Sequence, residues 1–184
     1  MRDSMSVPLA AADKRPDLTT AIWLVVENGV LSGILGAVVV ALWFLLLDVV
    51  TRGTPFYTPS LLGSIAFAGK NASEVAGVDG AAVFAYTGLH GLLFLFAGVT
   101  LAAMVAQFER NPQAGMILLL LFVTFEAILW SVGVSSIPAL AGVVGAWAIL
   151  VANLASAAVM FVFLLRRYPH AIDRLRGIWE EREE

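Results

Sequence analysis

Residues 29–50 decide the fold: they read GVLSGILGAVVVALWFLLLDVV and carry one charged side chain, Asp48. A bilayer core is about 30 Å thick, and a helix needs about 20 apolar residues to cross it. This stretch meets that length. For one stretch alone, the alternative is a fully buried helix of a soluble protein, so the rest of the chain has to decide between the two.

Three further apolar stretches of spanning length follow, at residues 81–107, 114–137 and 139–165. Four such helices cannot all be buried in a small protein without a polar shell. The composition provides none, because 60% of the residues are hydrophobic and 14% are charged, against about 45–50% and 25% in soluble domains. The sequence therefore predicts an all-α fold, an integral membrane antiparallel four-helix bundle. It forms a single transmembrane domain with a cytoplasmic tail at 166–184.

The connections between the stretches support the antiparallel order. Asn111-Pro112 and Pro138 break the chain tightly, so the spans that they join are antiparallel neighbours. The long connection, Thr51 to Gly80, contains Thr58-Pro59, a capping hydroxyl followed by proline at a first helical position. We predict a short interfacial helix there, between the first and second spans. Residues 16–28 are predicted to form another interfacial segment that continues into the first span, with a kink near Asn28.

Basic residues predict the orientation, because they concentrate on the cytoplasmic side of membrane proteins. Both termini and the connection between spans two and three share one side, and that side carries nine basic residues. They are Arg2, Lys14, Arg15, Arg110, Arg166, Arg167, Arg174, Arg176 and Arg182. The other side carries Arg52 and Lys70. We therefore predict cytoplasmic termini, in a bacterial inner (plasma) membrane.

Small residues form ridges on two of the predicted spans. Gly29 and Gly33 have GxxxG spacing, and the fourth span carries Ala141, Gly145, Ala148, Ala152 and Ser156. Such ridges let helix backbones approach closely in a membrane. They predict close packing inside one bundle, with a homodimer face as the alternative.

One set of polar residues is predicted to meet inside the membrane. Helix rise places His90 and Glu126 about 14 and 16 Å, and Asn153 about 20 Å, from the outer ends of three different spans. Each would be costly alone in hydrocarbon, so a shared hydrogen bond or ion pair is expected. The cluster is either a structural pair that fixes helix register or a site. As a site it offers either His90 as a haem or metal ligand, with the carboxylate hydrogen-bonded to the histidine and not to the metal, or a proton relay.

Four aromatic residues lie near this level: Trp43, Tyr86, Trp130 and Trp147. They are interpreted as ordinary belt and core residues, or as an outward-opening pocket for a quinone, a tetrapyrrole or a lipid. Asp48, at the outer end of the first span, is expected to cap a helix end or to pair with Arg52.

Motifs and composition narrow the function classes. The chain has no cysteine, which excludes disulfides, thiolate zinc sites and iron–sulfur clusters. The net charge of −3 and the lack of a basic stripe argue against nucleic acid, and catalytic motifs are absent. We therefore expect a non-catalytic accessory or structural subunit of a membrane assembly, with lipid, other subunits or a second copy as partners. The alternatives are a haem- or quinone-binding electron-transfer protein that uses His90, and a bundle that moves protons or small solutes through His90, Glu126 and Asn153.

Overall fold

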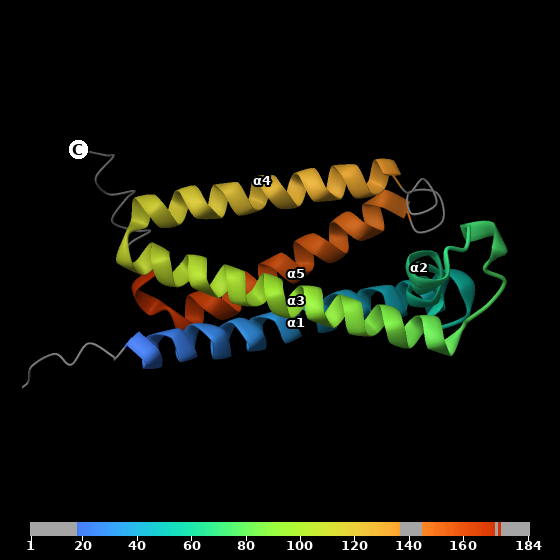
Figure 1. The fold of residues 1–184 in the computed structure, drawn as a ribbon, viewed down its shortest axis with the longest axis horizontal. Coiled ribbons are helices and arrows are strands. Elements are labelled where there is room, and N and C mark those ends of the chain that lie inside the picture. The colour runs from blue at the N-terminus through green and yellow to red at the C-terminus, as the bar shows by residue number, and fades with distance from the viewer. Residues whose placement is uncertain (1–17, 137–144, 172, 174–184) are drawn as a thin grey trace, which may run out of the picture.

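The computed structural model describes residues 18–136, 145–171 and 173. Within residues 112–136, the side chains of residues 122, 125, 126, 128–130 and 132–136 are outside the described part. The described residues form helices and no strand (Figure 1). The elements are α1 (Leu18–Arg52), α2 (Tyr57–Ala68), a 3-10 turn η1 (Ala72–Glu74), α3 (Gly80–Arg110), α4 (Pro112–Ser136) and α5 (Ala146–Arg167).

Three of these helices, α1, α3 and α5, are long and apolar enough to cross a membrane. This finding supports the prediction of a membrane protein. The second predicted span corresponds to α3 and the third to α4. That α4 crosses the membrane stays a prediction, because its fully described apolar stretch, Pro112–Leu121, is shorter than a membrane span. Of the fourth predicted span, residues 139–144 lie outside the described part, and the rest belongs to α5.

The first helix is longer than its apolar stretch. α1 has 35 residues and runs without interruption from Leu18 through Asn28 and Gly29 to Arg52. At about 1.5 Å per residue it is about 52 Å long, well beyond an apolar core of about 30 Å. Residues 18–28, predicted as an interfacial segment that continues into the first span with a kink near Asn28, are the first turns of this helix. Helix geometry continues through the polar Glu27 and Asn28, where the hydropathy signal stops.

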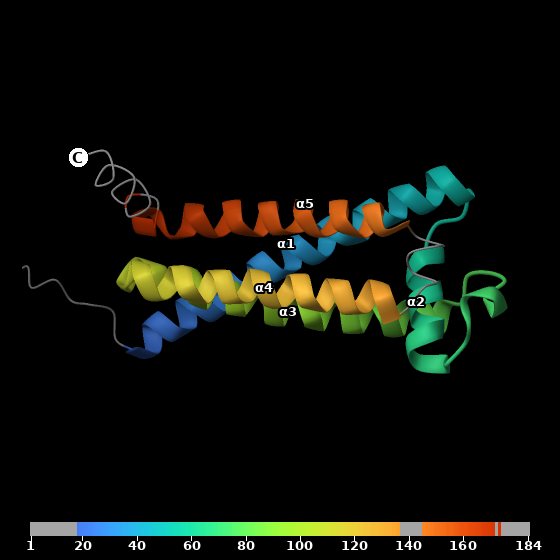
Figure 2. The same cartoon turned by 90° about the horizontal axis from the view of Figure 1, so that it is seen from above.

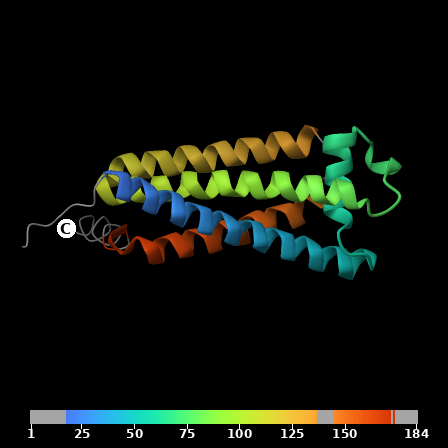
Figure 3. The same cartoon turned by 60° about the horizontal axis from the view of Figure 1, so that its bottom comes forward.

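The helices give the molecule two distinct ends (Figure 1). The start of α1, the α3–α4 turn and the end of α5 lie together at what we call the Arg110 end. α2 and η1 lie at the opposite end, the α2 end. Figures 2 and 3 show α1 running obliquely across α3 and α5, and α1 makes extensive contacts with both. α4 packs mainly against α3.

Glycines let α1 and α3 touch through their backbones. A side chain added at Gly33 would collide with the carbonyl group of Phe94, and one added at Gly98 would collide with the backbone of Gly29 and Gly33. On its other side, Gly36 of α1 meets α5 at Ser156 and Met160. The close approach that the GxxxG spacing predicts is thus made inside one chain.

The buried face of α5 follows an i, i+4 ridge. Its members are Ala148, Ala152, Ser156, Met160 and Leu164. At the Arg110 end this ridge joins α3 in an apolar core that includes Leu101, Ala102, Val105 and Phe108. Ridges of this spacing pack in the grooves of a neighbouring helix and fix an oblique crossing, as α1 and α5 show in Figure 2.

The short helix α2 lies across the end of the bundle rather than along it (Figure 2). It ends at Gly69, which has a left-handed φ of 63°, a conformation that glycine adopts readily. Its buried face consists mostly of small or hydroxyl-bearing residues, Thr58, Ser60, Leu61, Gly63 and Ser64. Gly63 is packed against the Ala82 carbonyl of α3, where a side chain would collide. Phe67 is 56% exposed.

Candidate functional site

His90, the central residue of the predicted site, lies half-buried on α3 and contacts α1. Its Nε2 atom is 3.4 Å from the backbone oxygen of Ala37. Because a carbonyl oxygen only accepts, Nε2 carries the hydrogen in this contact. The ring stacks on Tyr86 with centroids 5.8 Å apart and lies 4.7 Å from the ring of Phe94. Among the described residues, the hydrogen-bond partner of His90 is therefore the α1 backbone.

The other two members of the predicted cluster are described less fully. Glu126 lies on α4, and its side chain is outside the described part of the structure. Asn153 lies on α5 and its side chain is exposed. It is seven residues from Met160, which is buried, so the two share one side of the helix. On that side of α5, the side chain of Met160 is buried inside the chain and the side chain of Asn153 is exposed.

Three of the four predicted pocket aromatics have described side chains, and they form two groups. Trp43 donates from Nε1 to the Ala148 oxygen at 3.0 Å, which ties α1 to α5. Its ring meets Trp147 edge-on, with centroids 6.2 Å apart. Tyr86 stacks on His90 instead. The side chain of Trp130 lies outside the described residues.

Asp48 forms a buried polar site at the α2 end that the sequence indicated only in part. Its carboxylate is 1% exposed. Oδ2 accepts from the Thr58 backbone N–H and Oδ1 from the Thr58 hydroxyl, both at 2.7 Å. Arg52 Nε lies 3.8 Å from Oδ1, and the same guanidinium sits 4.3 Å from the centre of the Tyr57 ring. A carboxylate from α1 thus binds the start of α2, where free N–H groups favour negative charge.

This arrangement changes the interpretation of the Thr58-Pro59 signal. We expected the Thr58 hydroxyl to cap the helix by accepting a backbone hydrogen bond. In the structure α2 begins at Tyr57, after Phe56 with a φ of 67°, and the Thr58 hydroxyl donates to Asp48. Asp48 was expected to cap a helix end or to pair with Arg52. It binds the start of the neighbouring helix α2, and it also lies close to Arg52 of its own helix.

Further hydrogen bonds stabilise the loop between α2 and α3. The Ser60 hydroxyl accepts from the Asp79 N–H at 2.8 Å, and the Asp79 carboxylate accepts from the Ala81 N–H at 2.9 Å as the cap of α3. At η1, the Asn71 backbone and side chain donate to the exposed Glu74 carboxylate and lower its pKa. These bonds hold the start of α3 against α2.

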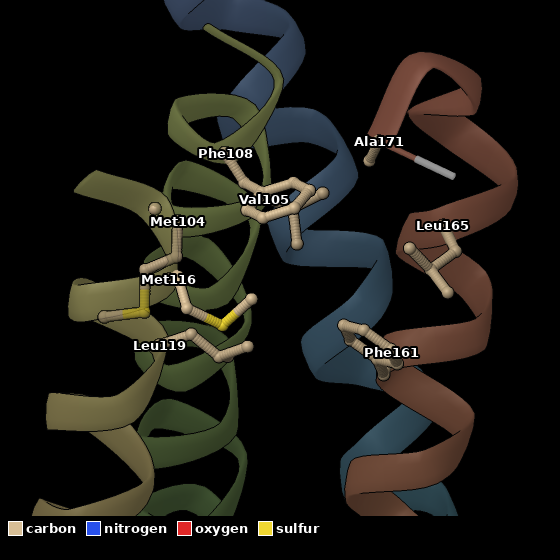
Figure 4. A pocket seen from close by; sticks show the side chains of 9 residues that line it. Met104, Val105, Phe108, Met116, Leu119, Phe161, Leu165 and Ala171 are labelled. Atoms are coloured by element: carbon tan, nitrogen blue, oxygen red, sulfur yellow. The ribbon is translucent and has the colours of Figure 1, made fainter. Parts of the chain in front are cut away.

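A pocket lies at the Arg110 end, away from the four aromatic residues predicted to line one (Figure 4). It is lined by α3, α4 and α5, and it holds about 390 Å³ of space outside the protein atoms, part of it open to the surroundings. Its walls are apolar. No residue pattern predicted this pocket, because it depends on how far α4 and α5 stand apart.

Among the described residues, no three histidine, aspartate or glutamate side chains gather where they could hold a metal ion. Comparisons of the chain with models of known protein families, with curated proteins and with solved structures find no match.

Proposed function

We propose that the chain is a four-span inner-membrane protein with cytoplasmic termini, which serves as a non-catalytic accessory or structural subunit of a larger membrane assembly. The observation that carries this proposal is the sparse packing of its apolar helices. In the apolar windows of α1, α3 and α5, only 22–28% of the residues are buried inside the chain. Lipid and neighbouring protein surfaces are the coverings that suit the remainder.

α4 gives the specific reason to invoke a protein partner. It packs mainly against α3 and leaves large apolar side chains such as Ile117 and Leu121 exposed. Helix association in a membrane depends on close packing, because lipid tails are as apolar as leucine. A span with a single neighbour has few such contacts, and a second subunit would supply more.

Photo-crosslinking in native membranes tests this proposal. We place a photoreactive residue at Phe96, which is 74% exposed on α3, or at Leu121 on α4. We expect a discrete protein adduct of fixed mass from at least one of these two positions. The matched control is Ala102, buried on α3, which should give products only within the chain. Lipid adducts alone from both exposed positions would contradict the accessory role.

The α2 helix supports the placement of this end at a membrane surface. It lies across the bundle axis (Figure 2) and turns its hydroxyl-bearing residues inward, while Phe56 and Phe67 stay exposed. An exposed aromatic edge on a helix parallel to the membrane plane is typical of an interfacial element. We propose that α2 rests in the outer interface.

A second candidate function, the movement of protons or small solutes, is supported by helix register. His90 lies fourteen residues from Met104 on α3, and residue 126 lies seven from Leu119 on α4. Residues seven apart share one side of a helix, and Met104 and Leu119 both line the pocket at the Arg110 end. This register would bring positions 90 and 126 toward the space between α3, α4 and α5, beside the α1 backbone that His90 contacts, and it is the observation that supports this candidate.

Reconstitution into liposomes tests the second candidate. If it holds, proton flux through the wild-type protein should fall to background after His90→Leu. The control is His170→Leu, since His170 is the other of the two histidines and lies beyond the end of α5. Equal flux in both variants would remove this candidate. An absorption spectrum of the purified protein addresses the haem alternative, for which His90 would have to offer a ring nitrogen other than the one directed at Ala37.

A further inference from the structure

We infer that the pocket at the Arg110 end binds one acyl chain of a phospholipid, whose phosphate lies at the arginine-bearing helix ends. The inference rests on the proposed membrane insertion. Figure 4 shows the pocket as a groove between α3, α4 and α5. Its walls include the apolar side chains of Met104, Phe108, Met116, Leu119, Phe161 and Leu165.

The size of the groove selects a thin occupant. Its three walls each span about five residues, which is about 7.5 Å of helix. A helix about 10 Å across would displace roughly 600 Å³ over that length, whereas the space of about 390 Å³ already includes the part that is open to the surroundings. A helix from a partner or from a second copy could therefore not be enclosed between the three walls. A single hydrocarbon chain is much narrower and enters along the open side.

The chemistry of the walls selects an apolar occupant. Methionine, phenylalanine and leucine side chains line the groove, and they offer water no strong hydrogen-bonding partners. An apolar cavity of this kind stays dry unless an apolar ligand fills it. Met104 of α3 and Met116 of α4 lie next to each other on one side of the groove, and Phe161 and Leu165 of α5 lie on the other (Figure 4). Flexible methionines adapt well to an irregular chain.

The charges at the rim suit the phosphate of a lipid. α3 ends at Arg110, and α5 ends with Arg166 and Arg167. The nearby carboxylate of Glu109 is already engaged, because it accepts from the Ala171 N–H at 3.2 Å. The exposed Arg110 and Arg166 are therefore placed at the level where a lipid that enters the groove from this side carries its phosphate.

An acyl chain in this position would complete the packing of α4. α4 and α5 form opposite walls of the groove (Figure 4), while α4 packs mainly on α3. The chain would fill the space between Leu119 and Phe161 and add packing between two helices that have few contacts with each other in the described part of the structure. The lipid would thus act as a structural ligand.

Native mass spectrometry of protein released from lipid nanodiscs tests the inference. We expect wild type to retain one phospholipid, and Leu119→Trp to lose most of it because the indole fills the groove. The control is Leu120→Trp, whose side chain is 66% exposed on α4 outside the groove, and which should retain lipid as wild type does. If Leu119→Trp fails to fold, Met116→Phe against Ile117→Phe repeats the comparison.

The outcomes separate this inference from the proposal on which it depends. Wild-type protein that an alkaline wash removes from membranes would overturn the membrane insertion itself. Protein that stays in the membrane but retains equal lipid in the groove and control variants would overturn the acyl-chain site alone. Unchanged retention in the double variant Arg110→Gln, Arg166→Gln would overturn the placement of the phosphate.

Discussion

Gly98→Ala is expected to destabilise the protein by about 2 kcal/mol or more, because the new methyl group has no space. It would collide with the backbone of Gly29 and Gly33 on α1. Backbone atoms cannot rotate away as a side chain can, so α1 and α3 would have to separate along the contact that also holds His90 near Ala37. Equilibrium unfolding in mixed micelles, followed by circular dichroism, measures the change.

Gly88→Ala is the matched control on the same helix. A methyl group at Gly88 meets nothing within 4 Å, and alanine favours a helix over glycine by up to about 1 kcal/mol. We therefore expect this variant to be unchanged or more stable, so the two substitutions have opposite signs. Equal effects of Gly98→Ala and Gly88→Ala would show that the glycine contact between α1 and α3 does not hold the bundle together.

Asp48→Ala is expected to have the second large effect, a loss of about 2–4 kcal/mol. The substitution removes the acceptor of both Thr58 hydrogen bonds and leaves Arg52 without the carboxylate 3.8 Å away. Buried donors that lose their partner cost their full desolvation penalty. We also expect faster hydrogen exchange of the Thr58 amide, which mass spectrometry of the α2 peptide can follow.

Two controls separate this site from helix capping in general. Asp79→Ala removes an exposed cap of α3 and should cost about 1 kcal/mol. Thr58→Val removes the hydroxyl bond and keeps the backbone bond, so its effect should lie below that of Asp48→Ala. An Asp48→Ala variant as stable as wild type, with unchanged exchange at Thr58, would show that the carboxylate does not anchor α2.

The long helices could be predicted from the sequence because hydropathy needs no tertiary information. The stretch predicted at 81–107 became α3, Gly80–Arg110, with an error of a few residues. The apolar span was predicted to begin at Gly29, whereas α1 begins at Leu18, within the interfacial segment predicted at residues 16–28, because hydropathy marks where a helix becomes apolar and not where it begins. The small-residue ridges predicted close contacts but could not identify which helices would make them.

The polar contacts were harder to predict because they depend on chain reversal. Asp48 and Thr58 are ten residues apart, and only the turn through Gly53 and Phe56, both with positive φ, brings them together. His90 was expected to pair with Glu126, whose side chain lies outside the described part of the structure, so this pairing stays a prediction. The partner of His90 that the structure describes is the carbonyl of Ala37, and a backbone acceptor leaves no mark in a sequence. The groove at the Arg110 end depends on helix divergence, which no residue pattern encodes.

Cysteine accessibility in intact cells tests the central claim, four membrane crossings with cytoplasmic termini, most directly. The chain has no native cysteine, so each introduced cysteine reports without background. An impermeant maleimide should label Lys70→Cys and Ser136→Cys from outside. Gln113→Cys, at the α3–α4 turn, and His170→Cys should react only after the membrane is opened. Labelling of Gln113→Cys and Ser136→Cys from the same side would show that α4 does not cross, and labelling of Lys70→Cys only from the cytoplasm would reverse the orientation.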